Sequence, residues 1–333
     1  MKKNFIFISL LLVITLLCSA CSIVQPTVLT IDGEEISLSE YNYYFSIAKL
    51  QAEQTVAADQ IDMYWQTEKD GKTTFEILKD SAFDEMVALR VTAKKAEQMG
   101  ISYNDSDVRQ NISGFKSQIL QAAASESQFY EMTNTDSKTI SEIAKLYAIR
   151  SVMLSKLADE GKIELSDAAL TDYFKNNFYK ANHILVLTQD ATTGAALTDE
   201  QKAEKKKQAE EILQRAQKGE NFDNLVKELS EDPGKESNPN GYVFTSGEMV
   251  PEFEEAVKNL QMNQISGIVE TSYGYHIIKR LPLTAQDEVA GLETYKDYIQ
   301  SELMMNYINT NVAEWKKEFT IVENKEPINK IKL

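Results

Sequence analysis

Apolar residues in the first half of the chain recur mostly at helical spacing. The pattern is continuous over residues 74–99 and stops at Gly100, a common helix C-terminal signal. Further helices are predicted over residues 106–124, 137–158 and 166–176, because each opens at a residue that can cap a helix. The 137–158 helix carries a stripe that predicts one buried face, namely Ile140, Ile143, Leu146, Ile149, Met153 and Leu157.

A hairpin and a helix start precede these helices. Apolar and polar residues alternate over 28–36 around Asp32-Gly33, and this dipeptide suits a two-residue hairpin turn. Ser37-Leu38-Ser39-Glu40 then predicts a capping box that opens a helix. That helix carries an aromatic cluster made of Tyr41, Tyr43, Tyr44 and Phe45. Core packing with a few amphipathic rings at the surface is the favoured interpretation, and a groove for unfolded chains is the alternative.

The pattern changes near Ala181 from helical repeats to strands, turns and short helices. Strands are predicted over 182–187 and 275–281, with helices over 198–219 and 221–230 and a third beginning at Val250-Pro251. A longer helix is predicted over 294–319, followed by a strand-like segment at 320–322. Because an isolated helix and strand bury little apolar surface, we expect this C-terminal segment to dock on the N-terminal helices.

The N-terminus has the pattern of an export signal. Two lysines precede an apolar run over 5–17, which is short for a membrane-spanning helix. Ser19 and Ala20 before Cys21 resemble the lipobox of bacterial lipoproteins, although Cys18 stands where a lipobox prefers Leu. This resemblance implies a signal peptide over 1–20, a lipid on Cys21 and a tether over 21–27. An ordinary secretory signal or an uncleaved anchor is the alternative.

Charge and composition disfavour a nucleic-acid-binding function and indicate a globular protein. The 333 residues include 35 Lys and Arg against 51 Asp and Glu, a formal net charge of −16. This balance argues against nucleic acid as the main partner, since phosphate binding needs a cationic surface. With 43% hydrophobic residues the chain is globular, and its length predicts two or three folded units.

Four ordered motifs in the strand-rich part resemble the parvulin family of peptidyl-prolyl isomerases. The resemblance covers roughly residues 181–281 and rests on these stretches: His183-Ile184-Leu185-Val186, Leu229-Ser230-Glu231-Asp232-Pro233, Phe244-Thr245-Ser246-Gly247-Glu248-Met249-Val250-Pro251-Glu252-Phe253 and Gly274-Tyr275-His276-Ile277-Ile278. An ordered set of this length is far more specific than one short motif.

Together with the lipobox and the helical flanks, the whole chain resembles the PrsA-type foldase lipoproteins. This implies an α+β fold, in which a parvulin-like domain over 181–282, a small antiparallel sheet ringed by helices, is inserted in a mainly helical chaperone domain. The chaperone domain would combine residues 28–180 with a docking segment over 283–333.

The function implied is that of an isomerase and foldase that assists newly exported, unfolded polypeptides with X-Pro bonds. The protein would be anchored through the Cys21 lipid on the extracytoplasmic face of the cell membrane. The sequence does not decide between a monomer and a homodimer. One alternative is a holdase whose parvulin domain is catalytically weak or inactive. A solute-binding lipoprotein is disfavoured, because it needs repeated strand-helix-strand units that the helical first half lacks.

The resemblance also implies roles for residues of the site. Met249 and Phe253, four apart and on one side of a helix, would cradle the proline ring, with Phe244 as a further substrate-binding residue. His183, Asp232 and His276 would form the polar, catalytic floor. From the residues alone, Met249 and Phe253 are equally core positions, and Asp232 is an ordinary turn residue.

Rotation about an X-Pro bond breaks no covalent bond and requires no cofactor or metal. The two histidines lie far apart in the sequence, and local spacing suggests no third metal ligand beside them. We therefore expect a site made only of this chain's side chains.

Two departures from the parvulin pattern affect the expected specificity. Residues 187–200 contain no Lys or Arg, whereas phosphoprotein-directed parvulins carry a basic cluster there, so no phosphate-specific recognition is expected. Asn238-Pro239-Asn240-Gly241-Tyr242 stands where the family usually has Gly-Gly-Asp-Leu-Gly, so the apolar Leu of the pocket wall is missing or shifted. Weaker or more selective activity is expected from the second change.

Overall fold

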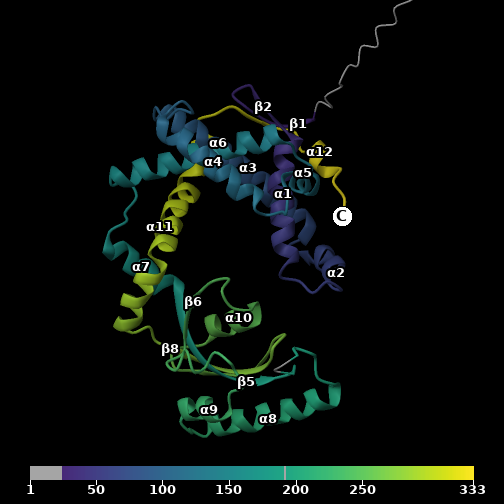
Figure 1. Ribbon diagram of the computed structural model, residues 1–333, viewed down its shortest axis with the longest axis vertical. Coiled ribbons are helices and arrows are strands. Elements are labelled where there is room, and N and C mark those ends of the chain that lie inside the picture. The colour runs from purple at the N-terminus through teal and green to yellow at the C-terminus, as the bar shows by residue number, and fades with distance from the viewer. Residues whose placement is uncertain (1–24, 191–192) are drawn as a thin grey trace, which may run out of the picture. The chain divides into compact units, whose positions relative to one another are not determined.

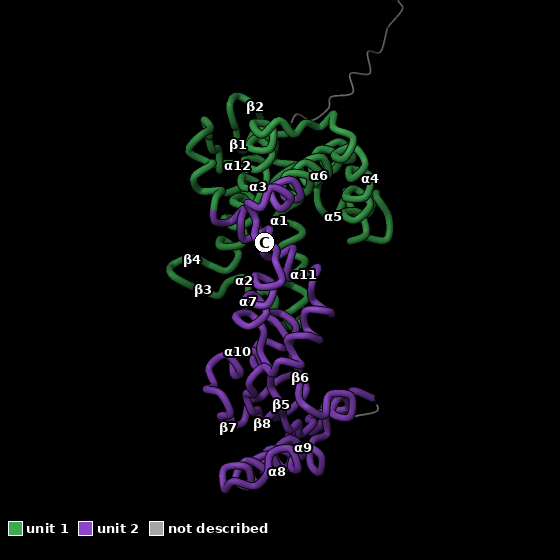
Figure 2. Tube along the Cα trace, turned by 90° about the vertical axis from the view of Figure 1, so that its left-hand side faces the viewer, with its two compact units in different colours: residues 1–153, 311–333 green, residues 154–310 purple. Residues whose placement is uncertain are grey.

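The computed structural model describes residues 25–190 and 193–333, so the predicted signal peptide and Cys21 lie outside the described residues. The chain divides into two compact units, residues up to 153 with 311–333, and residues 154–310 (Figure 2). These divisions fall inside two helices, whereas the predicted domain boundaries at 181 and 282 follow the family pattern and stay a prediction. No helix within the described ranges combines the length and apolar character that crossing a bilayer requires.

The first unit is mainly helical, as the periodicity predicts. The predicted helices over 74–99, 106–124 and 137–158 are present, and the stripe of the last one is at most 2% exposed. Two short helices, α2 and α5, were not predicted. The helices that begin in this unit are α1 (Leu38–Glu53), α2 (Ile61–Gln66), α3 (Thr74–Gln98), α4 (Ser106–Leu120), α5 (Glu126–Thr133) and α6 (Ser137–Asp159).

A three-stranded antiparallel sheet of order β2-β1-β9 joins segments far apart in the sequence. The predicted hairpin consists of β1 (Thr27–Ile31) and β2 (Glu34–Ser37), and its turn residues Asp32 and Gly33 have φ angles of 49° and 83°. Such positive angles at both central positions define the tight turns that suit the twist of a hairpin. Strand β9 (Ile321–Glu323) pairs with the other side of β1 and is followed by the short helix α12 (Glu326–Asn329). A separate small hairpin contains β3 (Glu68–Lys69) and β4 (Lys72–Thr73).

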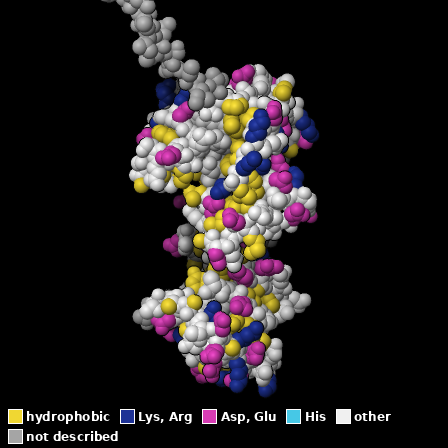
Figure 3. Space-filling model, turned by 90° about the vertical axis from the view of Figure 1, so that its right-hand side faces the viewer, with side chains coloured by type: hydrophobic (Ala, Val, Ile, Leu, Met, Phe, Trp, Pro, Cys, Tyr) yellow, Lys and Arg dark blue, Asp and Glu magenta, His cyan; other side chains and the backbone are white. Residues whose placement is uncertain are grey.

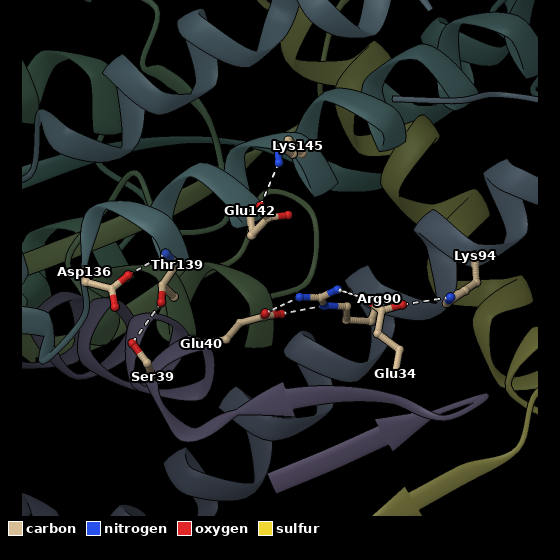
Figure 4. Close-up of polar contacts among 9 residues, drawn as sticks. All are labelled: Glu34, Ser39, Glu40, Arg90, Lys94, Asp136, Thr139, Glu142 and Lys145. Atoms are coloured by element: carbon tan, nitrogen blue, oxygen red, sulfur yellow. Dashed lines mark hydrogen bonds and ion pairs between the residues drawn. The ribbon is translucent and has the colours of Figure 1, made fainter. Parts of the chain in front are cut away.

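The predicted capping box at the start of α1 is wrong, although the helix does begin at Leu38. Ser37 makes no side-chain capping hydrogen bond. The carboxylate of Glu40 instead accepts two hydrogen bonds from the guanidinium of Arg90 on α3, one of them 2.8 Å long (Figure 4). Arg90 also donates to Glu34 of β2 at 2.7 Å. An ion pair between helices therefore takes the carboxylate that the local pattern assigned to the cap.

The aromatic cluster of α1 belongs to the core, which confirms the main part of the favoured interpretation, while the expectation that a few of these rings lie at the surface is wrong. Tyr41, Tyr43, Tyr44 and Phe45 are each at most 8% exposed. Their rings pack against one another and against rings of other helices, for example Phe45 edge-on to Phe75 with centroids 5.6 Å apart. A groove at these four residues is excluded because their rings are covered.

The second unit is built on a four-stranded antiparallel sheet of order β6-β5-β8-β7. The central strands β5 (Phe178–Leu187) and β8 (Gly274–Leu281) include both predicted strands, and β5 begins four residues earlier than expected. The outer strands β6 (Tyr242–Thr245) and β7 (Ile265–Glu270) were not predicted.

Helices cover both faces of this sheet (Figure 1). Helices α8 (Asp199–Gln217) and α9 (Phe222–Leu229) pack on one face over a buried cluster that includes Ile184, Val186 and Ile277. On the other face α10 (Pro251–Asn259) contributes Phe253 and Val257 to a cluster with Ile278. The arrangement confirms the α+β fold class with a small antiparallel sheet between helices.

Helices α7 (Asp167–Asn177) and α11 (Ala285–Lys316) pack around Phe174, Phe178 and Ile299. Helix α11 begins at Ala285, nine residues before the predicted start. Its Gly291 faces Phe174 so closely that a Cβ atom would lie 2.1 Å from the ring. The glycine permits this contact while the helix continues through it.

Charges of both signs intermingle on the surface. On the face drawn in Figure 3, Lys and Arg side chains are interspersed with Asp and Glu, with no continuous basic field. One less exposed pair joins Lys180 of β5 to Asp287 of α11 at 2.8 Å, with side chains 8% and 16% exposed. Most other ion pairs are exposed, and pairs of that kind contribute little to stability.

Candidate functional site

A cavity of about 470 Å³ lies within the second unit. Its lining comes from β5, β6, β8, the first turn of α10, and the connections that follow β5 and α9 or precede α10 and β8. Five of the predicted site residues line it, namely His183, Asp232, Met249, Phe253 and His276. The fold thus brings together in one cavity residues that are spread over almost a hundred positions of the sequence.

Two buried histidines form its polar floor. His183 lies on β5 and His276 on the adjacent strand β8, where His276 pairs with Leu185. This register places the two imidazoles beside each other with centroids 5.2 Å apart, and the residues are 8% and 5% exposed. His276 Nε2 lies 2.9 Å from the hydroxyl of Thr271, so that hydroxyl fixes the orientation of the ring.

Asp232 lies beside this floor in the turn after α9. Its Oδ2 atom is 3.7 Å from His183 Nε2, which is too long for a hydrogen bond and short enough for an electrostatic interaction. The carboxylate accepts a 2.6 Å hydrogen bond from the hydroxyl of Tyr242 and a 3.0 Å bond from the backbone N–H of Gly234. The carboxylate is therefore held in place by two donors, neither of which is a histidine.

Both histidines are neutral at physiological pH. Burial lowers the pKa of His183, and the nearby Asp232 carboxylate only partly opposes that shift. Burial and then the adjacent His183 lower the pKa of His276 to about 3. The floor of the cavity therefore presents one carboxylate and two uncharged imidazoles.

Acid is expected to destabilise this unit through His276. Below about pH 6.5 the unfolded chain binds a proton at this residue that the folded chain excludes down to about pH 3. The histidine contributes no pH dependence above pH 6.5, and the free energy of unfolding falls as pH drops through that window. At about pH 4.5 the loss amounts to about 2–3 kcal/mol.

Urea unfolding at about pH 7 and about pH 4.5 measures this loss of stability, and a His276→Asn variant should lack this part of the decrease. Equal pH dependence in both proteins would contradict the assignment.

The apolar wall is formed by Met249 and Phe253, although not as predicted. Helix α10 begins at Pro251 and its N-cap Val250 is extended, so Met249 precedes the helix. The expectation that both residues lie four apart on one helix is therefore wrong, yet both side chains line the cavity. Phe253 is 3% exposed and presents its ring edge-on to both histidines, with centroids 5.2 and 5.6 Å apart.

Phe244, the third residue expected to bind substrate, does not line the cavity. It lies on β6, is 1% exposed and packs against Phe253 with centroids 6.1 Å apart. In this structure Phe244 supports the position of Phe253 from within the core.

Sequence reasoning missed other residues of the lining, above all Tyr242 and Tyr273. Tyr273 is 49% exposed at the cavity, just before β8. Tyr242 is the final residue of the segment that departs from the parvulin pattern, and that departure was the signal that could have identified it. The Tyr242 ring forms part of the cavity wall.

The donor types in the cavity do not suggest a metal site. Across residues 25–190 and 193–333, no group of three or more His, Cys, Asp and Glu side chains is arranged to hold an ion. What the arrangement offers chemically is an apolar recess beside a buried, largely uncharged polar floor. Such a recess suits a small apolar ring next to a peptide group.

Comparison with known proteins places these features in a family. The sequence model of the PPIC-type PPIase domain matches residues 183–281, and that of the SurA-like N-terminal domain matches residues 3–132. The foldase protein PrsA of Caldanaerobacter subterraneus is 30% identical over 307 residues, which cover 88% of either chain. The chain belongs to the PrsA foldase family.

Other PrsA proteins match over shorter lengths. PrsA of Halalkalibacterium halodurans is 32% identical over 209 residues, covering 60% of this chain and 56% of that one. The crystal structure of PrsA from Bacillus anthracis is 24% identical over 71% of this chain and 96% of that one, with a TM-score of 0.30. The solution structure of NmPin, the parvulin of Nitrosopumilus maritimus, is 34% identical over 32% of this chain and 96% of that one, with a TM-score of 0.24.

Membership of the PrsA family, together with its parvulin domain, makes this protein a peptidyl-prolyl cis-trans isomerase and foldase that acts on polypeptides. The predicted enzyme class is confirmed.

Proposed function

We propose that the cavity of the second unit is the isomerase site and that it acts on newly exported, unfolded polypeptides outside the cytoplasmic membrane. The observation that carries this proposal is the meeting of the apolar pair Met249 and Phe253 with the buried floor of His183, Asp232 and His276 in one cavity. A proline ring fits the apolar side, and the preceding peptide group then faces the polar floor.

The reaction requires twisting of an amide. Rotation about the C–N bond has a barrier of about 20 kcal/mol, because amide resonance is lost in the twisted form. Resonance also places negative charge on the carbonyl oxygen, and the twisted amide carries less of it. A carboxylate beside this oxygen therefore disfavours the planar forms more than the twisted form, which lowers the barrier.

The histidines serve this site as neutral, oriented polar groups. Their lowered pKa values keep positive charge away from the carbonyl oxygen, where such charge would stabilise the planar amide. A covalent role is disfavoured at Asp232, because a carboxylate beside neutral imidazoles is a poor nucleophile toward an amide. Asp232 is assigned an electrostatic role and the two histidines a positioning role.

The charge around the cavity argues against phosphorylated substrates. Among the described lining residues, four are acidic and none is Lys or Arg; the acidic residues are Asp190, Glu231, Asp232 and Glu248. Glu231 is paired with Lys205 at 2.6 Å, whereas Asp232 and Glu248 accept hydrogen bonds from neutral donors, the Tyr242 hydroxyl and the Thr245 N–H, which do not cancel their charge. A phosphoserine before the proline would bring a dianion next to these carboxylates, and the described lining offers no Lys or Arg to pair with the phosphate.

A panel of peptides tests both the activity and this specificity. The full-length protein is expected to isomerise unphosphorylated Ala-Pro and Lys-Pro peptides, and to act on the matching phosphoserine-Pro peptide at least about threefold more slowly. Protease-free NMR exchange spectroscopy measures the rates. Faster turnover of the phosphopeptide would contradict the assigned specificity.

A holdase with a slow parvulin domain is the second candidate, and the altered segment 238–242 beside the cavity favours it. It predicts that the folded protein prevents aggregation of an unfolded client while every peptide of the panel isomerises at the uncatalysed rate. That outcome would remove the proposal that this cavity catalyses X-Pro isomerisation.

We extend the proposal to the location of the protein. The lipobox-like residues before Cys21 support cleavage there and attachment of a lipid, with residues 21–27 as the tether. Strand β1 starts at Thr27, the last residue of this proposed tether, so the first unit follows the tether without a further linker. A lipid on Cys21 would hold both units at the extracytoplasmic face of the membrane.

A further inference from the structure

The cavity contains a tyrosine for which the isomerase mechanism proposed above has no role. Tyr242 begins β6, and its hydroxyl donates the 2.6 Å hydrogen bond to Asp232 Oδ2. Its ring also lies against the imidazole of His183, with centroids 5.6 Å apart and planes tilted by 38°. One side chain thus contacts both polar residues on this side of the floor.

The backbone around Tyr242 is fixed. Tyr242 pairs with Ala181 of β5, and the preceding Gly241 has a φ of 86°. A Cβ atom at Gly241 would lie 2.7 Å from the carbonyl oxygen of Ala181, so only glycine allows this close approach. The start of β6 is therefore held tightly against the central strand, and the direction of the tyrosine ring is set.

A second glycine leaves room for the phenol group. A Cβ atom at Gly234 would lie 2.3 Å from the Tyr242 hydroxyl oxygen. The N–H of the same Gly234 donates to Asp232 Oδ1, while Tyr242 donates to Oδ2. The two donors hold the two carboxylate oxygens separately, which defines the plane of the carboxylate.

Tyr242 remains a donor over the working pH range. Burial, and then its hydrogen bond to the Asp232 carboxylate, raise its pKa well above the usual value for tyrosine. Without this donor, the carboxylate is free to turn toward His183 Nε2, now 3.7 Å away, and to form a direct hydrogen bond. Such a bond would draw the carboxylate away from its present position in the cavity.

We propose that Tyr242 is a positioning residue of the isomerase site, which acts by holding the Asp232 carboxylate at the cavity floor. This inference rests on the electrostatic role proposed for Asp232. It also gives a role to Tyr242 in the segment 238–242, which departs from the parvulin pattern, because this ring lines the cavity and its hydroxyl bonds to Asp232.

A double-mutant cycle on the full-length protein tests the proposal. Tyr242→Phe removes only the hydroxyl, and we expect kcat/KM for an Ala-Pro peptide to fall about fivefold, the effect expected for loss of one typical protein hydrogen bond. Peptide affinity, measured by NMR titration, should change less than about twofold, because the hydroxyl acts on Asp232 rather than on substrate. In an Asp232→Ala background the same substitution should have almost no effect.

Tyr179→Phe is the matched control. It removes a tyrosine hydroxyl from the same sheet, outside the cavity lining, and should leave kcat/KM unchanged. A fivefold loss from Tyr242→Phe in both backgrounds would overturn the proposal, because the hydroxyl would then act without Asp232. If kcat/KM falls in Asp232→Ala but not in Tyr242→Phe, the positioning role of Tyr242 is overturned, while the function proposed for the cavity stands. No loss in either variant would also remove the role proposed for Asp232.

Discussion

Replacement of Met249 by alanine is expected to lower kcat/KM for unphosphorylated X-Pro peptides ten- to hundredfold while the protein stays folded. Met249 is only partly buried and precedes α10, so its truncation leaves the core cluster under that helix largely intact. Its side chain forms one wall of the cavity. Loss of the apolar contact that holds a proline ring is worth about 1.5–3 kcal/mol, which corresponds to this range of rates.

Met262→Ala is the control for this experiment. Met262 belongs to the same unit, is 55% exposed and lies outside the cavity lining. It should retain wild-type turnover, and circular dichroism should show unchanged folding for both variants. Wild-type activity in a folded Met249→Ala protein would mean that proline binds elsewhere.

Replacement of Arg90 by methionine is expected to destabilise the first unit by about 3–5 kcal/mol. Arg90 is the partner of Glu40, whose side chain is 5% exposed, and it also bonds to Glu34 (Figure 4). Without the guanidinium, the Glu40 carboxylate is left buried and unpaired, which costs far more than an exposed ion pair contributes. Urea denaturation of the full-length protein, followed by circular dichroism, measures the difference.

Two further variants identify the cause of that loss. Lys95→Met breaks the more exposed pair with Glu318 and should cost at most about 1 kcal/mol. Adding Glu40→Leu to Arg90→Met removes the unpaired charge and should restore most of the stability. If the double variant is as unstable as Arg90→Met alone, packing of the arginine stem rather than burial of a charge explains the effect.

The sequence predicted most long helices because their signals are local. Apolar spacing, capping residues and a terminal glycine are all contained in the segment that forms the helix, as in α3 and α6. Errors arose where a distant residue decided the outcome. Glu40 was assigned to a cap, but Arg90 on another helix binds it. The last long helix was expected to start at residue 294, yet α11 begins at Ala285 and runs through Gly291, which lies against Phe174.

The sequence predicted part of the candidate site, as it predicted part of the fold. Family motifs identified His183, Asp232, His276, Met249 and Phe253, which the fold brings to one cavity, although their roles stay proposals. Nothing in the motifs places Phe244 behind Phe253 or brings Tyr242 to Asp232. Strand β6 was not predicted, because its four residues follow a turn-rich segment and owe their conformation to pairing with β5.

The pairing of β9 with β1 means that the sheet of the first unit can be completed only late in folding. Strand β1 lies near residue 30, and its second neighbour near residue 322, so the ribosome completes nearly the whole described chain before this sheet can close. The parvulin sheet needs only residues 178–281 and is available earlier. In a chain exported N-terminus first, as proposed above, the isomerase fold can therefore form while the first unit still lacks an outer strand.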